Sequence, residues 1–352
     1  MRNGEPAIAE ARRIAELDGV RGIAILAVII HHEFDAPLLW GGVDIFFVLS
    51  GFLITGILIR QKESGGPYFS YFYARRVRRL LVPYLLLLVV SSLLFGTAWM
   101  KHWYWFAFFA ANIGTLLDQM GHVSLNPLWS LAVEEQFYFV WPIVVMGVRR
   151  NALLIVSLII LIATPILRGV ATPWFDTRFP IYYLTPFRMD LLASGAILAW
   201  LHRWNRPWLD RLSYWPQVAL FVIPGLVVFL SVIDPGFRTG ANTVRGNVLI
   251  YEFMNMMATS LVVTALLGRG LICRFLRNPI LRYIGTISYS MYLIHKTALL
   301  LAARVVPGRA ATFTLGLAIA VLYATVCWYG FERRLLGIRR PKQAKDVLIP
   351  AA

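Results

Sequence analysis

The stretch GVRGIAILAVIIHHEF, residues 19–34, is apolar apart from a cation near its start and two imidazoles and a carboxyl near its end. Arg21 and His32 stand eleven positions apart. Because eleven residues make about three α-helical turns, a helix places both side chains on one face, about 16 Å apart along its axis. His31 points about 100° away and shares that face less well. Ionisable groups at membrane depth indicate function, although an anchoring cation and a hydrogen-bonded core histidine give the same pattern.

The composition places this segment in a membrane protein. The chain has 352 residues, of which 59% are hydrophobic and 15% charged, whereas soluble domains carry about 25% charged residues. Many apolar segments approach the length that crosses about 30 Å of hydrocarbon. The sequence therefore predicts an all-α fold, a polytopic membrane helical bundle of about ten transmembrane helices, with no separate soluble domain.

The charge and the cysteines exclude other classes. The net charge of +16 would suggest nucleic acid in a soluble protein, but here the excess of Lys and Arg in cytoplasmic loops explains much of it. Cys273 and Cys327 have no metal-ligand spacing, and we expect no disulfide framework. The polar N-terminal lead lacks the pattern of a cleaved signal peptide.

Ten apolar runs predict ten spans, and an eleventh is ambiguous. If the aromatic run 102–118 crossed, every later basic loop would be inverted, so we expect an interfacial or re-entrant segment there. With ten spans, both termini lie on the same side of the membrane, and the basic loops place that side in the cytoplasm. The expected location is the plasma (inner) membrane. Residues 1–340 would form one transmembrane domain and 341–352 a short cytoplasmic tail. The predicted spans are 20–37, 42–60, 80–99, 127–147, 152–170, 184–201, 215–233, 250–267, 285–303 and 311–330.

Asp44 opens the second predicted span, in GGVDIFFVLSGFLITG. The dipole at a helix N-terminus favours a carboxylate, which could also orient an imidazole or hold it protonated. A helix cap is the simpler explanation. Gly51 and Gly56 in the same stretch would allow close helix approach, or would serve packing alone.

A basic run, YFYARRVRRLLVPY, carries Arg75, Arg76, Arg78 and Arg79 in a predicted cytoplasmic loop that leads into the third span. Guanidinium groups match phosphate oxygens, so such a cluster suits a nucleotide-bearing cofactor. A cluster that only anchors the chain to anionic lipid would look the same.

Two adjacent carboxyl groups, Glu134 and Glu135, fall in the first half of another apolar span. They are costly at membrane depth unless they are paired or protonated. They point to different helix faces and need different partners, and pairing with a buried arginine such as Arg188 is the structural explanation. Asp190 beside Arg188, and His295, are further buried candidates, although a hydrogen-bonded core position is the simpler interpretation of His295.

In this order and spacing, these stretches resemble the acyltransferase 3 family of bacterial membrane acyltransferases. The resemblance covers nearly the whole chain, and the family's R-x10-H signature falls on Arg21 and His32 and its cytoplasmic arginine motif on 75–79. In the closing Glu-Arg-Pro element, Arg334 stands where Pro is usual. The matching stretches are LDGVRGIAILAVIIHH, GVDIFFVLSGFLI, FYARRVRRL, LWSLAVEEQFYFVWP, LTPFRMDLLASGAILAW and IGTISYSMYLIHK.

The resemblance implies a ten-helix membrane fold and acyl transfer from cytoplasmic acyl-CoA to a hydroxyl, commonly on a sugar. Many relatives also carry a C-terminal hydrolase-like domain. This chain stops at Ala352, so we expect a second catalytic step to need another protein.

Acyl transfer to an alcohol needs a base and charge stabilisation for the tetrahedral oxyanion. His32 is the candidate base, or the nucleophile that carries the acyl group. Glu134 or Asp44 would orient its imidazole, and Arg21 would position the donor. The CoA phosphates would be held by three side chains of the basic run, Arg75, Arg76 and Arg79.

We therefore predict an O-acyltransferase that moves an acetyl group from acetyl-CoA to a hydroxyl of a cell-surface or exported polysaccharide. The expected partners are acyl-CoA, a carbohydrate or small-molecule hydroxyl acceptor and membrane lipids, with no bound cofactor, metal or nucleic acid. One alternative is acylation of a small secondary metabolite such as a macrolide. Another is a proton-coupled transporter that uses His32, Glu134, Asp190 and His295, although the matching halves of many transporters are not found here.

Overall fold

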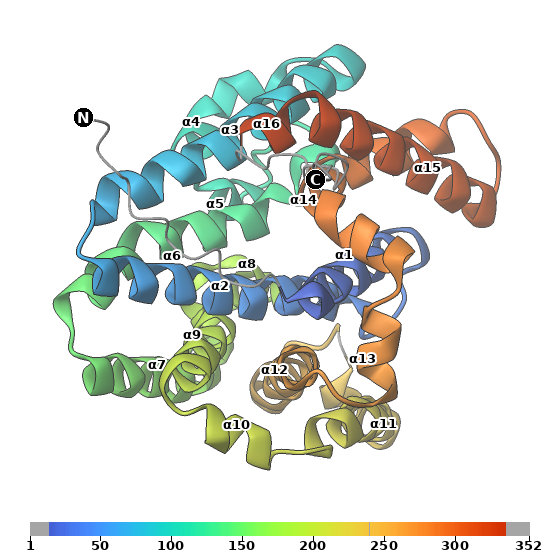
Figure 1. Cartoon of the computed structure of the whole chain (residues 1–352). Coiled ribbons are helices and arrows are strands. Elements are labelled where there is room, and N and C mark those ends of the chain that lie inside the picture. Colours follow the sequence, from blue (N-terminus) through green and yellow to red (C-terminus); the bar gives the residue numbers. More distant parts are fainter. Residues whose placement is uncertain (1–13, 239, 336–352) are drawn as a thin grey trace, which may run out of the picture.

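The computed structural model describes residues 14–238 and 240–335, and every regular segment in them is helical. Ten helices are long, and they form one layered bundle (Figure 1). The short helices that join them include α4 (Trp103–Ala107), α5 (Ala111–Leu116), α8 (Phe179–Tyr183), α10 (Arg206–Arg211), α13 (Gly270–Leu276) and α16 (Arg333–Leu335). The long helices are α1 (Ala15–Phe34), α2 (Gly42–Ser64), α3 (Tyr68–Phe95), α6 (Leu128–Gly147), α7 (Arg150–Ala171), α9 (Met189–Trp204), α11 (Trp215–Ile233), α12 (Tyr251–Leu267), α14 (Pro279–Ala303) and α15 (Arg309–Cys327).

The predicted all-α membrane bundle is confirmed, and each predicted span has a long helix at its place. Six helical segments in the described residues are long and apolar enough to cross a membrane, and they contain α2, α3, α7, α11, α12 and α15. Ten crossings therefore remain a prediction. It requires that α1, α6, α9 and α14 also cross the membrane, although each of them carries charged groups or is shorter than the six segments above. The predicted tail 341–352 and both chain ends lie outside the described residues.

The outer helices expose apolar side chains that only lipid would cover. On α11, Phe221 and Val232 are more than 70% exposed, and on α7 Ile159, Ile162 and Ile166 are about 60% exposed. Large exposed apolar faces are rare on soluble monomers. By contrast, α2 lies inside the bundle, with 72% of its apolar window buried, so it forms the centre around which the other helices pack.

Glycines let the inner helices touch backbone to backbone. A Cβ on Gly285 of α14 would lie 1.7 Å from the carbonyl oxygen of Asp18 on α1, and one on Gly22 would lie 2.3 Å from that of Leu281. The same relation joins α2 and α9, where a Cβ on the predicted packing residue Gly51 would lie 2.1 Å from the oxygen of Leu192. Only a residue without a side chain fits such contacts, so these helices are held in fixed register.

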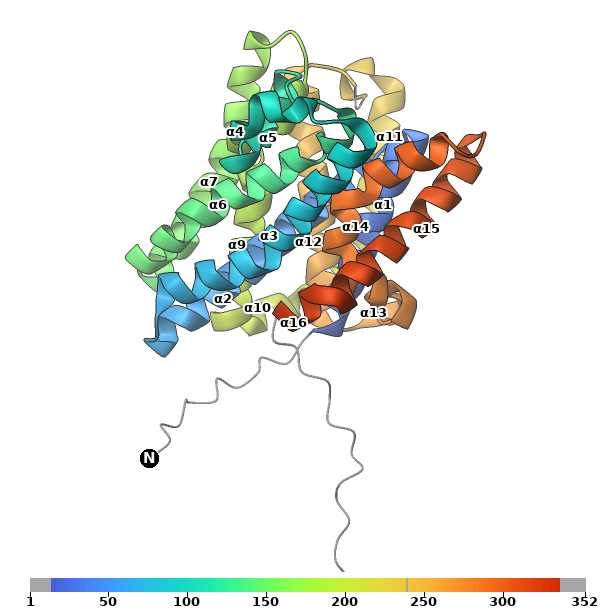
Figure 2. The same ribbon diagram turned by 90° about the horizontal axis from the view of Figure 1, so that it is seen from above.

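The two ends of the bundle differ. Figure 2 shows α10, α13 and α16 at one end, together with the hairpin that joins α2 and α3, and α4 and α5 at the other. The turn between α2 and α3, α10 and α13 thus share one end, which we call the basic end because these segments and their flanks carry Arg60, Lys62, Arg203, Arg206, Arg211, Arg269, Arg274 and Arg277. The positive-inside rule predicts a cytoplasmic location for such an end, and the orientation of the bundle stays a prediction.

Two predictions about individual segments have definite outcomes. The run 102–118 is broken into the short helices α4 and α5, of five and six residues, neither of which is long enough to span a membrane at 1.5 Å per residue. The basic run 75–79 does not lie in a loop, and that prediction is wrong. Helix α3 begins at Tyr68, directly after Pro67, because Ala, Arg and Leu favour a helix there and Pro readily precedes one.

Candidate functional site

His32 lies in the last turn of α1, beside a second histidine, which lies on α14. The ring centroids of His32 and His295 are 4.8 Å apart, in an edge-to-face arrangement. The Nδ1 atom of His32 lies 2.8 Å from the carbonyl oxygen of Val28, and the Nδ1 of His295 lies 2.5 Å from that of Tyr292. Because a carbonyl only accepts, each Nδ1 donates its hydrogen, and each neutral ring then keeps its lone pair on Nε2.

His31 has a different environment from His32, as the helical spacing predicts. Its Nδ1 lies 3.0 Å from the carbonyl oxygen of Ala36, in the turn after α1. Its ring centroid is 5.6 Å from that of His32, and His295 contacts the ring of His32 and not that of His31.

A cluster of charged side chains lies near the other end of α1, where α3 and α6 meet. The guanidinium of Arg76 lies 3.4 Å from Glu135 and 3.9 Å from Glu134, and it stacks on the ring of Tyr138 at 3.8 Å. Glu134 accepts further hydrogen bonds, from Ser50 at 2.7 Å and from Tyr138 at 3.3 Å. The two adjacent carboxyl groups are therefore held by an arginine of the basic run, and the suggested pairing with Arg188 is wrong.

Two more arginines join this cluster without an ion pair in the described residues. The charge of Arg79 interacts with those of Arg21 and Arg76, and the charge of Arg21 interacts most strongly with that of Asp18, one turn earlier on α1, and then with that of Glu134. Within residues 14–238 and 240–335, neither Arg21 nor Arg79 has a carboxylate oxygen within 4.0 Å. The Nε of Arg21 is also buried without a hydrogen-bond partner in that part of the chain. Two partly buried guanidinium groups are thus available for an anion.

Arg75 lies apart from the cluster. It is exposed on α3 and donates to the hydroxyl of Tyr71, one turn earlier on the same helix. The helix turns Arg76 and Arg79 into the bundle and leaves Arg75 and Arg78 outside, since residues three apart share a face. Of the three predicted phosphate ligands, the structure places two at the cluster.

A row of polar side chains leads from the arginines to the histidines, and we call it the polar strip. On α14, Tyr289 interacts with the charges of Arg76 and Arg79, and the hydroxyl of Tyr292 lies 2.5 Å from that of Ser130 on α6. Tyr289, Tyr292 and His295 follow one another at intervals of three residues, so they lie on one side of α14. The strip consists of Arg76, Arg79, Glu134, Ser130, Tyr289, Tyr292, His295 and His32.

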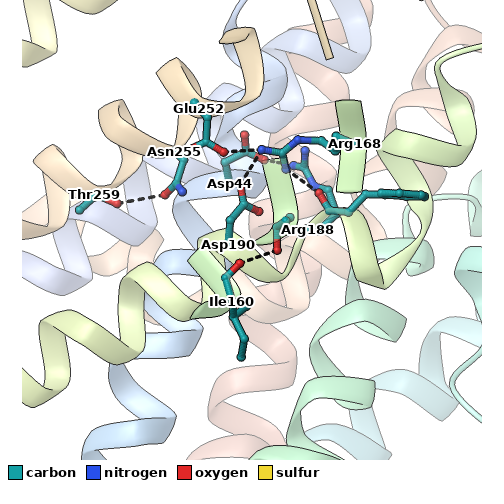
Figure 3. A network of polar contacts seen from close by, with 10 residues as sticks. Asp44, Ile160, Arg168, Arg188, Asp190, Glu252, Asn255 and Thr259 are labelled. Carbon is teal, nitrogen blue, oxygen red and sulfur yellow. Dashed lines mark hydrogen bonds and ion pairs between the residues drawn. The ribbon is translucent and has the colours of Figure 1, made fainter. Parts of the chain in front are cut away.

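Asp44 belongs to a separate buried network, drawn in Figure 3. Its carboxylate pairs with Arg188, and both side chains are almost wholly buried. Beside it, Arg168 pairs with Asp190 at 2.9 Å and also with Glu252. No hydrogen bond joins Asp44 or Glu134 to His32 in the described residues, and the partner of the His32 Nδ1 is the backbone of Val28. The structure therefore does not bring either predicted orienting carboxylate to the imidazole.

Aromatic rings surround Arg188 in that network. The guanidinium carbon lies 5.0 Å from the centre of the Tyr251 ring, 5.4 Å from that of Tyr182 and 5.7 Å from that of Phe47. Cation–ring contacts of this kind stabilise a buried charge. The helices α2, α7, α9 and α12 are thus tied together by ion pairs inside an apolar shell.

Several residues of the charged cluster and of the polar strip were not singled out from the sequence. Ser50, Ser130, Tyr138 and Tyr289 are ordinary residues of apolar helices, and only their packing partners reveal them. Glu332 is another, since it is buried and accepts from Ser290 at 2.5 Å. The sequence did contain a signal for Glu332, because this residue lies in FERRL, the counterpart of the family's closing Glu-Arg-Pro element. In the described ranges, no group of three or more His, Cys, Asp or Glu side chains is arranged to hold a metal.

Comparison with known proteins identifies the fold's family. The acyltransferase domain family matches residues 14–332. The chain is 32% identical to a putative peptidoglycan O-acetyltransferase of Bacillus subtilis over 327 residues, which cover 84% of this chain and 50% of that protein. It is 30% identical to a peptidoglycan O-acetyltransferase of Listeria monocytogenes over 313 residues, 80% of this chain and 49% of that protein.

A putative O-acetyltransferase of Staphylococcus aureus is 28% identical over 316 residues, 81% of this chain and 50% of that protein. The chain thus spans about half the length of the curated relatives that it matches. No solved structure matches it. Since the family match covers nearly all of the described residues, the chain belongs to the acyltransferase domain family.

Proposed function

We propose that this chain is a membrane-embedded O-acetyltransferase that moves an acetyl group from acetyl-CoA to a hydroxyl of a cell-surface polysaccharide. The observation that carries the proposal is the polar strip, which leads from the arginine cluster, where Arg21 and Arg79 have no carboxylate oxygen within 4.0 Å in the described residues, to a histidine with a free Nε2 lone pair. The relatives are named for O-acetyl transfer to peptidoglycan, so a glycan of the cell wall is the acceptor class that we propose.

The donor would bind with its phosphates at the basic end. Arg21 and Arg79 offer guanidinium groups that match phosphate oxygens, and their charges are not cancelled by a carboxylate within 4.0 Å in the described ranges. Arg21 and His32 are about 16 Å apart along α1, which suits an extended thiol arm with a nucleotide at one end and a thioester at the other. Arg76 would hold Glu134 and Glu135 in place and would not bind the phosphates itself.

The acceptor would approach from the opposite end. A pocket of about 370 Å³ opens there among the ends of α1, α14 and α15, and its lining includes Glu33, Lys296 and Arg309. Glu33 directly follows His32 and Lys296 directly follows His295, so the pocket lies one residue from the histidine pair along both helices, and neither histidine is part of its lining. It has the size of a small-molecule site and charged groups that can bind hydroxyls.

His32 would act as the general base. Its Nε2 takes the proton of the acceptor hydroxyl while the oxygen attacks the thioester carbonyl carbon. The carbon–sulfur bond then breaks, and the proton passes from His32 to the departing thiolate, which leaves as CoA thiol. Half-exposure of His32 leaves it able to touch both substrates. If His32 instead carried the acetyl group covalently, a rapid quench without acceptor would trap labelled protein.

The basic end determines the orientation in the membrane that we propose for the bundle. We propose that this end faces the cytoplasm, where acetyl-CoA is made, and that the pocket beside His32 faces the outer side of the plasma membrane. The transporter alternative is not proposed, because Glu134 and Asp190 belong to different ion-pair networks, and no hydrogen bond joins either carboxyl to a histidine in the described residues.

The test uses the purified chain in lipid nanodiscs with acetyl-CoA labelled in the acetyl group. Peptidoglycan glycan strands and, separately, a macrolide are offered as acceptors, and label that mild base releases from the product reports an O-ester. We expect base-labile label on the glycan strands. Label on the macrolide alone would favour the secondary-metabolite alternative, and no transfer to any hydroxyl acceptor would contradict the proposal.

A further inference from the structure

His295 is a buried histidine with an unused nitrogen. Its side chain is wholly buried, at 0% exposure, and its Nε2 has no hydrogen-bond partner among the residues that the structure describes. Buried polar atoms are almost always hydrogen-bonded, so such an atom needs an explanation. Burial keeps His295 from touching a substrate, whereas His32 is only half-buried.

The surroundings of His295 direct it toward His32. Its Nδ1 is fixed by the carbonyl of Tyr292 at 2.5 Å, and its ring contacts are with His32 at 4.8 Å and Tyr292 at 5.4 Å between centroids. The bond to the backbone holds the tautomer, so that the lone pair stays on Nε2. A neutral imidazole held in this way can accept a hydrogen bond but cannot donate a second one.

The packing of α1 on α14 holds the two rings in register. The contacts of Gly22 with Leu281 and of Gly285 with Asp18 bring the two backbones together near their first turns. Both helices then run in the same direction, and His32 and His295 lie about ten residues further along each. A rigid contact at one end therefore sets the distance between the rings at the other.

We propose that His295 is the positioning residue of the acyl transfer, which accepts a hydrogen bond from His32 when that imidazole carries the hydroxyl proton. This inference rests on the proposed function, in which His32 is the base. In the resting state His32 is neutral, and both Nε2 atoms carry lone pairs. After the hydroxyl proton has moved to the Nε2 of His32, and before it passes to the thiolate, a small rotation of that ring lets the N–H point to the Nε2 of His295.

The chemical balance is unchanged by His295. The hydroxyl proton moves to His32 and then to the thiolate sulfur, and the acetyl group moves from sulfur to the acceptor oxygen. His295 gains no proton, because a charge on so deeply buried a ring would be costly. Its effect falls on the protonated form of His32 in the tetrahedral intermediate, between uptake of the hydroxyl proton and its delivery to the thiolate. It therefore lowers the energy of that intermediate, and of transition states that resemble it, more than that of the ground state.

Substitution of His295 separates this role from simple packing. His295→Phe keeps a ring of similar size but removes the acceptor, and we expect kcat to fall about 10-fold to 30-fold with little change in KM for acetyl-CoA. His295→Gln places an amide oxygen near the former Nε2, and we expect it to recover part of that loss. If His295 only filled space, the Phe variant would keep more activity than the Gln variant, because Phe is closer to His in shape and fills the buried site better than Gln.

The matched control is His31→Phe, which alters the other ring beside His32 and leaves His295 in place. We expect its kcat to stay within about 2-fold of the original. Kinetics are measured in nanodiscs with labelled acetyl-CoA and glycan strands, after thermal unfolding has shown which variants are folded. If His295→Phe does not fold, the comparison of His295→Gln with His295→Leu gives the same contrast.

The outcomes distinguish the two proposals. Loss of kcat in the Phe or Leu variant with partial rescue by Gln supports the positioning role. Near-normal kcat in a folded His295→Phe or His295→Leu protein overturns it, and so does equal loss in the Gln and apolar variants. If the unaltered chain transfers no acetyl group at all, it is the proposed function that fails.

Discussion

Three arginines of one helix, Arg75, Arg76 and Arg79, should respond differently to the same substitution with Gln. They lie within five residues of α3, yet the structure gives each a different environment. Arg79 has no carboxylate within 4.0 Å in the described ranges, Arg76 pairs with two, and Arg75 is exposed beside a tyrosine of its own helix. The three variants therefore separate donor binding, structural pairing and a surface effect.

For Arg79→Gln we expect weaker binding of acetyl-CoA with little loss of stability. A hydrogen bond to a charged group contributes about 1.5–3 kcal/mol, which corresponds to a rise of about 10-fold to 150-fold in Kd. Because Arg79 has no carboxylate within 4.0 Å in the described ranges, its substitution leaves no buried charge unpaired, and the free energy of unfolding should change little. The assay is calorimetric titration of free CoA into the purified chain, with KM for acetyl-CoA as the kinetic counterpart.

For Arg76→Gln we expect the reverse. The side chains of Arg76 and Glu135 are only 13% and 8% exposed, and removal of one member of a buried ion pair costs about 3–5 kcal/mol. The variant should unfold at a clearly lower temperature, and Glu135→Gln, which removes the carboxylate left unpaired, should restore part of that loss. Arg75→Gln should change both stability and CoA affinity by no more than about 2-fold, as an exposed substitution does. Unchanged CoA affinity in Arg79→Gln, or equal effects of all three substitutions, would refute the reasoning and leave a lipid anchor as the better explanation.

Three further predictions test other parts of the molecule. Asp44→Asn should lower the unfolding temperature strongly, because it leaves a buried guanidinium without its carboxylate; unaltered stability would contradict this. Gly285→Ala should disrupt the contact of α1 with α14 and lower the yield of folded protein, whereas Gly225→Ala, whose Cβ would meet nothing within 4 Å, should fold normally; equal yields would be contrary to the packing described. In intact cells an impermeant maleimide should label Val305→Cys but not Asn151→Cys, both exposed positions, while the native cysteines are buried; labelling of Asn151→Cys from outside would reverse the orientation.

The helices could be predicted from the sequence because the lipid imposes a simple rule. Apolar runs of sufficient length must form helices that satisfy their own backbone hydrogen bonds, and the predicted positions match the ten long helices. The start of α3 was placed wrongly, since a charged run that continues a helix beyond the membrane has no apolar signal. The ambiguous run 102–118 was resolved by charge, and α4 and α5 are indeed too short to span.

The site was predictable only where helical spacing decides it. The choice of His32 over His31 followed from its eleven-residue separation from Arg21, and it stays a prediction; the structure adds that the ring of His295 lies against that of His32. Which arginine pairs with which carboxylate depends on how distant helices pack, and one sequence contains no such information. Asp44 therefore went to the wrong partner in the prediction, and Glu134 and Glu135 were assigned Arg188 in place of Arg76.

The most direct test of the proposed function compares His32→Ala with His31→Ala in a single turnover. Each purified variant is loaded with labelled acetyl-CoA, mixed with glycan strands, and the base-labile label on the glycan is followed with time. We predict that His32→Ala still binds CoA and transfers no measurable acetyl group, while His31→Ala transfers at nearly the original rate. Near-normal transfer by His32→Ala, or loss of transfer in His31→Ala alone, would contradict the assignment of the base.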